Sequence, residues 1–324
     1  MENQKKIKVA FMIGSFPRVS ETFIINQVAD LIDRGIEVEV FSFTKGLSSL
    51  ENISQRFSDY KMSRLVHYLD MPQNKLIRFF AAVYKLLSIL LRKPSIFFKV
   101  LNFRKYGLTV KSLKLIFWVE PFIGKKFDLV HCHFGTIANK YLVIREIFGF
   151  KHKIITTFYG IDVSHIFKVK PRDYYDNLKK HCQSYLVMSD DMKRRVVEYG
   201  FSAEQVGVLP ISIDVASYPY SERHYSPGQQ INLISVGNFV EKKGFDDLLR
   251  ALAIVKQKTD KDFKCHIVGD GQLKEMIYGL TRELGIGDVV DFKGYMKLED
   301  LITLFTKMHL CLQPSKTSAD GDME

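Results

Sequence analysis

Several features that would assign this 324-residue chain to a common class are missing from its sequence. It has only four cysteines, at positions 132, 182, 265 and 311, and no two of them form a C-x-x-C pair. Scattered cysteines argue against a disulfide framework and indicate a reduced, cytosolic compartment. The first apolar run, residues 9–13, is too short for the hydrophobic part of a secretory signal, so we interpret it as the first β-strand.

Long hydrophobic runs and the common nucleotide-binding patterns are also missing. No uncharged apolar run reaches the roughly 18 residues that a membrane-spanning helix needs. The patterns G-x-G-x-x-G and G-x-x-x-x-G-K-[ST] are absent, and Gly269-Asp-Gly271 has Lys274 where a third glycine would stand. These absences weaken a nicotinamide-binding interpretation. With 46% hydrophobic residues the chain can still bury large cores, and we expect two domains.

Acidic residues are missing from a long internal stretch, where Asp70 is the last acid before Glu120. Between Lys75 and Lys126 the sequence has twelve Lys or Arg residues against this one acid. The local excess equals the net charge of the whole chain, +11, so the rest of the sequence is balanced. The positive charge is therefore a local patch rather than a general property of the protein.

Two interpretations of residues 71–126 are open. Basic and polar residues at helical spacing draw a narrow cationic stripe on an otherwise apolar helix: Lys75, Arg78, Lys85, Ser88 and Arg92. The stretch is either a helical insertion packed on its domain or an interfacial element on anionic lipid, and we favour the lipid interpretation. A nucleic-acid surface is disfavoured because the aromatic residues form an apolar face rather than an exposed stacking platform.

Outside this stretch, strand and helix patterns alternate, which predicts two doubly wound α/β domains with parallel sheets. Ser20 is expected to cap the first helix, and Gly35 to end it. We expect an N-terminal, acceptor-side domain at residues 1–214, a linker at 215–230 and a donor-binding domain at 231–324. The expected strands are 7–13, 37–43, 127–134, 153–158, 185–188, 206–209, 231–236, 263–268, 289–292 and 309–313. The expected helices are 21–34, 136–148, 172–181, 190–199, 245–258, 273–284 and 298–305.

The stretch 231–252 reads as strand, tight turn and helix, with Lys242, Lys243 and Gly244 at the join. A helix N-terminus offers unpaired N–H groups and the positive end of the helix dipole, so two lysines there suit a phosphate. The alternative is a solvated basic turn that opens an ordinary helix. The local sequence by itself favours this alternative, because Lys-Lys-Gly is a common tripeptide.

Three motifs that follow one another along the chain favour the phosphate site over the solvated turn: residues 236–244, 267–271 and 290–294. Together they resemble the donor half of GT-B glycosyltransferases. The closest resemblance is to the retaining family four, in particular to members that build bacterial capsular, colanic-acid-like and other exopolysaccharides. The resemblance covers essentially the whole chain and implies two Rossmann-like domains facing a cleft. It implies transfer of a sugar from a nucleotide-diphosphate sugar to a glycan or lipid-linked acceptor, with no cofactor and no metal.

The resemblance also assigns a donor site. Lys243 would stabilise the leaving diphosphate together with the helix start at Gly244, and Gly14 would lie where diphosphate and acceptor meet. Glu324 matches the first glutamate of a Glu, seven residues, Glu motif and would contact the donor sugar. Asn238 stands where the family usually has an arginine, so Lys242 would compensate or catalysis would be weaker. The loops that would approach the nucleotide contribute Gly269, Asp270, Tyr295 and Met296.

On the acceptor side the resemblance implies a loop and a cleft that involve Ser15, Ser20, Glu21, His133, Tyr159 and Gly160. Tyr159 replaces the histidine of the family and can still hydrogen-bond a sugar. His131 and His133 share one face of a strand, which suggests either a metal site or, as we favour, the end of a buried strand. Asp162 either acts in catalysis by orienting a hydroxyl or caps its turn, and both interpretations stay open.

The resemblance leads us to expect an incomplete second domain, because the sequence ends before the second glutamate and the C-terminal helix. Asp320-Gly-Asp322 looks like a metal motif of single-domain glycosyltransferases, and we discount it for that reason. One alternative is a non-catalytic, truncated or membrane-binding protein of the same fold, favoured by Asn238, Tyr159 and Ser212. Another is a nucleotide-sugar epimerase. We expect a location at the inner face of the plasma membrane, with an anionic membrane surface as partner and no nucleic acid.

Overall fold

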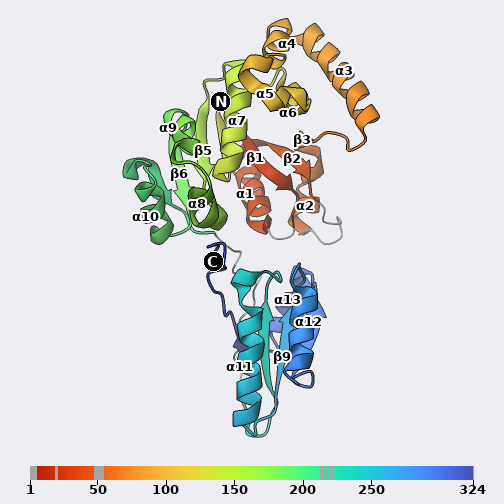
Figure 1. Cartoon of the computed structure of the whole chain (residues 1–324), viewed down its shortest axis with the longest axis vertical. Helices are drawn as coiled ribbons and strands as arrows, with labels where there is room; N and C mark the ends of the chain where they lie inside the picture. Colours follow the sequence, from red (N-terminus) through yellow and green to blue (C-terminus); the bar gives the residue numbers. More distant parts are fainter. Residues whose placement is uncertain are drawn as a thin grey trace. The chain divides into compact units, whose positions relative to one another are not determined.

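The computed structural model describes residues 6–18, 21–46, 55–211 and 224–323, with residues 213, 215, 218, 220 and 222 between the last two ranges. The chain divides into two compact units, Met1–Ser212 and Ile213–Glu324 (Figure 1). The residues predicted to link two domains, 215–230, lie at the start of the second unit. Among the described residues, no helix is long and apolar enough to cross a membrane.

Unit 1 is built on a seven-stranded parallel sheet in the order β3-β2-β1-β4-β5-β6-β7. Alternate residues of β1 enter different cores: Ala10 and Met12 pack on the side of α7, whereas Phe11 and Ile13 pack on the side of α1. Both faces of the strand are therefore buried, which explains its continuous apolar run. The strands are β1 (Lys8–Phe16), β2 (Glu37–Lys45), β3 (Val66–Tyr68), β4 (Leu129–His133), β5 (Lys153–Thr157), β6 (Ser184–Val187) and β7 (Val206–Val208).

The helices of unit 1 confirm the predicted alternation, with several differences. The segment predicted as one helix over 172–181 is a 3-10 turn, Arg172–Tyr175, followed by a short α9. The helices α2 and α8 and the strand β3 were not predicted. Gly35 ends α1 with a φ of 76°, as expected, whereas Ser20 lies outside the described residues. The helices are α1 (Thr22–Asp33), α2 (Gln55–Asp59), α7 (Gly135–Phe148), α8 (Phe167–Val169), α9 (Asp176–His181) and α10 (Asp190–Glu198).

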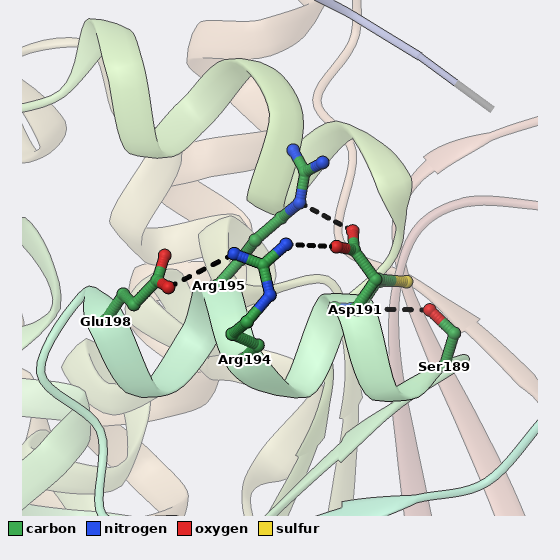
Figure 2. A network of polar contacts seen from close by, with 6 residues as sticks. Ser189, Asp191, Arg194, Arg195 and Glu198 are labelled. Carbon is green, nitrogen blue, oxygen red and sulfur yellow. Dashed lines mark hydrogen bonds and ion pairs between the residues drawn. The ribbon is translucent and has the colours of Figure 1, made fainter.

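Helix α10 has a cap and an ion-pair chain on its surface (Figure 2). The Ser189 hydroxyl accepts a hydrogen bond from the Met192 amide and so satisfies one free N–H of the first turn. Asp191 pairs with both Arg194 and Arg195, and Arg194 also reaches Glu198 at 3.2 Å. These side chains are exposed, so the network stabilises the helix only slightly.

The basic stretch forms a helical insertion that packs on unit 1, as one interpretation expected. It comprises α3 (Lys75–Arg92), α4 (Pro94–Val100), α5 (Phe103–Lys111) and α6 (Lys114–Val119). Ala82 and Ile89 of α3 belong to a buried cluster that includes Ile147 of α7. The Asn74 side chain caps α3 by accepting from the Leu76 amide at 2.9 Å. In Figure 1 the helix lies at the edge of unit 1.

Three basic residues of the α3 stripe contact the protein itself, whereas the fourth, Lys75, is exposed. Arg78 donates to the Pro72 carbonyl at 2.8 Å, Lys85 pairs with Glu120 at 2.7 Å, and Arg92 donates to the Ile123 carbonyl at 3.2 Å. The stripe thus provides internal contacts. The other face of the helix is apolar and open to solvent, with these side chains at 54–83% exposure: Leu76, Ile77, Phe79, Phe80, Tyr84, Leu87 and Leu91.

Unit 2 is a four-stranded parallel sheet in the order β10-β9-β8-β11. Four of its elements have the predicted bounds, and the last strand is shorter than the predicted 309–313. Leu249, Cys265 and Ile267 are at the centre of its core, where α11 covers the sheet. The elements are β8 (Ile231–Val236), β9 (Phe263–Val268), β10 (Val290–Gly294), β11 (Leu310–Cys311), α11 (Phe245–Lys258), α12 (Lys274–Glu283) and α13 (Leu298–Phe305).

Candidate active site

The strand order of unit 2 reverses between β8 and β11, and in open α/β sheets ligands bind at the carboxyl ends of strands at such a point. The basic turn lies there. Residues Glu241–Lys243 form one 3-10 turn, and Gly244 follows with a φ of 66° before α11 begins. A β-carbon on Gly244 would lie 2.0 Å from the Pro314 carbonyl oxygen. Glycine is therefore required by the backbone angle and by the close approach of the chain after β11.

Lys243 packs across the end of β8. A β-carbon on Gly237 would lie 3.2 Å from the Lys243 Cδ, so the glycine leaves room for the alkyl chain. Lys242 has a partner inside unit 2, because its ammonium lies 3.0 Å from an Asp322 carboxylate oxygen. The Lys316 amide also donates to the Lys242 carbonyl at 2.9 Å. The two predicted lysines thus lie at one turn, but Lys242 is held by the C-terminal segment.

The glycine loop after β9 packs directly on the turn after β8. A β-carbon on Gly269 would lie 1.9 Å from the Gly237 carbonyl oxygen, and the Phe239 amide donates to the Asp270 carbonyl at 2.9 Å. The Gly269 amide in turn donates to the Gly294 carbonyl at 2.9 Å. The three predicted motifs therefore converge at the carboxyl ends of β8, β9 and β10.

The remaining predicted donor residues lie around these loops. The Asp270 carboxylate pairs with Lys274 at 2.9 Å, and Asn238 lies in the turn after β8. Tyr295 is 45% exposed, whereas Met296 packs against the small core of Ile234 and Val268. Glu324 lies outside the described residues.

Sequence reasoning did not anticipate the role of residues 314–322 in holding the basic turn. The Lys316 ammonium lies 2.6 Å from Asp246 and 2.9 Å from Asp247 in the first turn of α11. Burial alone would raise the pKa of Asp246, but Lys316 holds it below its ordinary value. The Ala319 amide donates to the Glu241 carboxylate at 3.0 Å. No sequence signal links these partners, because 69 to 78 residues separate them.

In unit 1 the strand order reverses between β1 and β4, and the predicted acceptor-side residues lie there. Gly14 and Ser15 belong to β1, and the Gly14 carbonyl accepts a hydrogen bond from the Thr44 hydroxyl at 3.0 Å. His133 ends β4, and Tyr159 and Gly160 follow β5. The structure thus places these residues at one edge of one sheet.

Glu21, His133 and Tyr159 form a buried polar cluster at this edge. The His133 Nδ1 lies 2.8 Å from the Tyr159 hydroxyl, and the charge of Glu21 acts on Tyr159. Burial, and then the neighbouring His131, lowers the pKa of His133 well below its ordinary value, while burial raises the pKa of Glu21. Within the described part of the chain, His133 Nε2 and Glu21 Oε2 have no hydrogen-bond partner. Buried polar atoms in this condition suit a polar ligand.

His131 and His133 share one face of β4, as predicted, with ring centroids 4.3 Å apart. His131 Nε2 lies 2.7 Å from the Thr157 hydroxyl, and burial lowers its pKa to about 4. No group of three metal-ligating side chains is found among the described residues. The contacts with the Thr157 and Tyr159 hydroxyls are those of the buried strand end that we favoured.

Asp162 is fully buried and holds the start of α7. Its Oδ1 accepts from the Gly135 amide at 3.1 Å, and its Oδ2 accepts from the Tyr159 amide at 3.0 Å. Burial raises the pKa of this carboxyl to about 7, although these amides oppose the rise. The contacts are those of the cap interpretation, and its catalytic role stays a prediction. The Gly135 amide at the amino end of α7 already donates to Asp162, so it is not available to bind a phosphate.

Two parallel α/β units, each with glycine turns or polar side chains at a switch point, have the architecture of GT-B glycosyltransferases. Residues 20–217 match the family described as Glycosyltransferase Family 4, and residues 219–321 match Glycosyl transferases group 1. The chain belongs to Glycosyltransferase Family 4. It is a glycosyltransferase, and the epimerase alternative is not supported.

Curated relatives and solved structures agree with this assignment. The chain is 30% identical to the amylovoran biosynthesis glycosyltransferase AmsK of Erwinia amylovora, over 98% of this chain and 78% of that protein. It is 28% identical, with the same coverage, to the putative colanic acid biosynthesis glycosyltransferase WcaL of Salmonella typhimurium. The crystal structure of Anabaena HepE with UDP and glucose is similar in fold, with a TM-score of 0.61, 14% identity, and coverage of 97% of this chain and 76% of that one.

Proposed function

We propose that this protein moves a sugar from a nucleotide-diphosphate sugar, bound by unit 2, to a glycan or lipid-linked acceptor, bound by unit 1. The reaction belongs to bacterial surface polysaccharide biosynthesis, in which the relatives described above are named. The observation that carries the proposal is the convergence of three glycine turns at the carboxyl ends of β8, β9 and β10, where Lys243 packs on Gly237. Close backbone approach and a lysine at one point are what a diphosphate requires.

The chemistry follows from the leaving group. As the sugar departs, negative charge develops on the diphosphate, and a prearranged ammonium and backbone N–H groups stabilise it. The Lys243 ammonium and the helix start that follows Gly244 supply these groups, and we propose that no metal ion is needed. Transfer should therefore continue in EDTA, and loss of turnover that Mg²⁺ restores would contradict this part of the proposal.

The donor site is tested by titrating the protein with UDP, whose diphosphate would bind at Lys243. Lys243→Ala should weaken UDP binding by about ten- to a hundredfold, because it removes one charge-assisted contact. Lys258→Ala, at the far exposed end of the same helix, is the matched control and should bind UDP as the parent does. Equal UDP affinity of the parent and Lys243→Ala would overturn the assignment of this turn.

On the acceptor side, the proposal places unit 1 on the anionic inner face of the plasma membrane. It is supported by the open apolar face of α3, and the insertion also exposes Phe98, Phe103 and Leu108, at 53–80%. Exposed Lys75 and Lys93 flank this face at the two ends of α3, and the single acid of the insertion, Glu120, is already paired with Lys85. An apolar face with basic ends matches the interface of an anionic bilayer.

A further inference from the structure

Unit 1 contains an open cavity of about 1010 Å³ that the proposed chemistry has not yet used. It lies at the carboxyl ends of β1, β2 and β3, where Ser15, Thr44 and Tyr68 line it. Its opposite wall comes from the helical insertion, through Ala81 and Lys85 of α3 and Trp118 of α6. The cavity thus lies between the carboxyl edge of the sheet and the helical insertion.

The cavity carries more positive than negative charge, because four lysines and one acid, Asp70, line it. Lys45, Lys114 and Lys140 line it, and within the described residues none of them has a carboxylate at ion-pair distance. Lys140 lies over the Phe43 ring, 5.1 Å from its centroid. Burial of its ammonium, and then the charge of Lys114, lowers the pKa of Lys140. Like charges that are brought together in this way favour an anion between them.

A second basic cavity, of about 1040 Å³, provides a contrast in the same unit. It lies at the other end of the sheet, where β1 and β2 begin, and Lys126 and Lys151 line it. Carboxylates share that wall, and the Lys8 and Lys125 ammoniums there pair with Glu37 and Glu39. The second wall thus includes three acids, Glu37, Glu39 and Asp128, whereas the wall beside the insertion includes one, Asp70.

The cavity borders the apolar face of α3. Ala81 and Lys85, which line it, are four residues apart on one side of the helix. Ile77 and Tyr84, four residues before and three after Ala81, are neighbours on the helix surface and belong to the open apolar face. A molecule with its anionic end in the cavity could therefore extend a hydrocarbon part along α3.

We infer that this cavity binds the phosphate or diphosphate group of a lipid, with the lysine ammoniums on the anion and the hydrocarbon along the apolar face of α3. The inference rests on the proposed function and specifies the acceptor as a phosphate-bearing lipid. The cavity holds this end of the acceptor at the edge of the sheet that also carries Glu21, His133 and Tyr159.

The structure offers a direct readout, because Trp118 lines the cavity and is the single tryptophan of the chain. Its emission should therefore change when the cavity fills. The probe is dodecyl phosphate, kept below its micelle concentration, and the protein should bind it with a saturable change in emission. Inorganic pyrophosphate has the anion but no hydrocarbon chain, and dodecanol has the chain but no anion. Each should bind at least about tenfold more weakly.

Two charge-matched variants test the lysines. Lys114→Gln combined with Lys140→Gln should weaken dodecyl phosphate binding by about tenfold or more, because it removes both ammoniums. Lys126→Gln combined with Lys151→Gln makes the same change of net charge in the other cavity and should bind as the parent does. The inference is wrong if the first pair binds dodecyl phosphate as tightly as the control pair.

Two further outcomes are decisive. If inorganic pyrophosphate binds as tightly as dodecyl phosphate, the hydrocarbon chain adds nothing to binding, and the inference that the ligand is a lipid is wrong. UDP affinity, measured on the same samples, separates this inference from the proposed function. The Lys114 and Lys140 double variant should retain it, whereas absent UDP binding in the parent would remove the donor site and leave the cavity result standing.

Discussion

Individual residues show how unit 1 uses its charges, and Glu39 of β2 is the clearest case. Its carboxylate lies 2.7 Å from the His67 ring and 2.5 Å from the Lys125 ammonium. The hydrogen bond from His67, and then Lys125, lowers the pKa of Glu39 to about 2, although burial opposes the shift. The ordinary value is 4.5, so the folded state binds this proton less tightly than the unfolded chain does. The contribution is therefore present above about pH 4.5 and lost as the pH falls toward 2.

Glu39→Gln should lower the free energy of unfolding at pH 7 by about 1 to 2 kcal/mol, a figure discounted for the partial exposure of the carboxylate. The deficit should shrink as the pH falls from 5 to 3, because Glu39 of the unfolded parent chain takes up a proton in this range while the folded state stays ionised. Urea denaturation at a series of pH values measures it. Glu37→Gln, on the same strand and in an exposed pair with Lys8, is the control and should change stability little. Parallel pH curves for the two variants would contradict the prediction.

Asp162 lets the cap and catalytic interpretations be separated. Asp162→Asn keeps the shape but replaces one acceptor oxygen with an NH₂ group that faces backbone donors. We expect a loss of stability of about 1 to 3 kcal/mol, because a buried amide loses its partner. Below the unfolding transition, kcat for sugar transfer should stay within about threefold of the parent. A fall in kcat of a hundredfold or more with an unchanged Tm would instead establish a catalytic carboxylate.

Among the elements, α3 has an unusual orientation, since it buries part of its cationic stripe and exposes an apolar face. Charged residues of α3 pack inward because Glu120 and backbone carbonyls accept their hydrogen bonds. This arrangement leaves a hydrophobic surface that is costly in water unless something covers it.

Phe80→Ser combined with Leu91→Ser should weaken binding to vesicles of phosphatidylcholine and phosphatidylglycerol by about a hundredfold, because two large side chains no longer enter the interface. Sedimentation with the vesicles measures it. Ile254→Ser combined with Val255→Ser, on the exposed face of α11, is the matched control. Binding of the parent should also weaken with salt, because Lys75 and Lys93 contribute only surface charge. If the α3 variant and the control bind the vesicles equally, the apolar face of α3 is not the docking surface.

At the scale of the whole molecule, two units with separate cores predict two unfolding events rather than one. UDP should raise the Tm of only one transition, that of unit 2, because the proposed diphosphate site lies within it. At about a hundred times its dissociation constant, UDP should add roughly 2.7 kcal/mol to that unit. Differential scanning calorimetry with and without UDP measures this. One cooperative transition that shifts as a whole would show that the units unfold together.

The sequence by itself determined the architecture of both sheets. Apolar runs bounded by glycine and polar turns locate nearly every strand, and β8, β9, α11 and α13 begin and end where the pattern predicts. Local signals suffice because a doubly wound sheet buries its strands on both faces, so each strand is a continuous run of apolar residues. β3 is only three residues long, so it has no such run and was not predicted.

The candidate site was likewise predictable from the sequence only in part. The glycine motifs were visible in the sequence, because a turn that tolerates no β-carbon demands glycine at fixed positions. Only the tertiary structure decided which charges remain available. It paired Lys242 with Asp322 and turned Arg78, Lys85 and Arg92 toward the protein, while Lys114 and Lys140 came together at a cavity. The reason is that a sequence fixes the sign of each charge, whereas its partners come from segments that are distant in the chain and meet only when the domain folds.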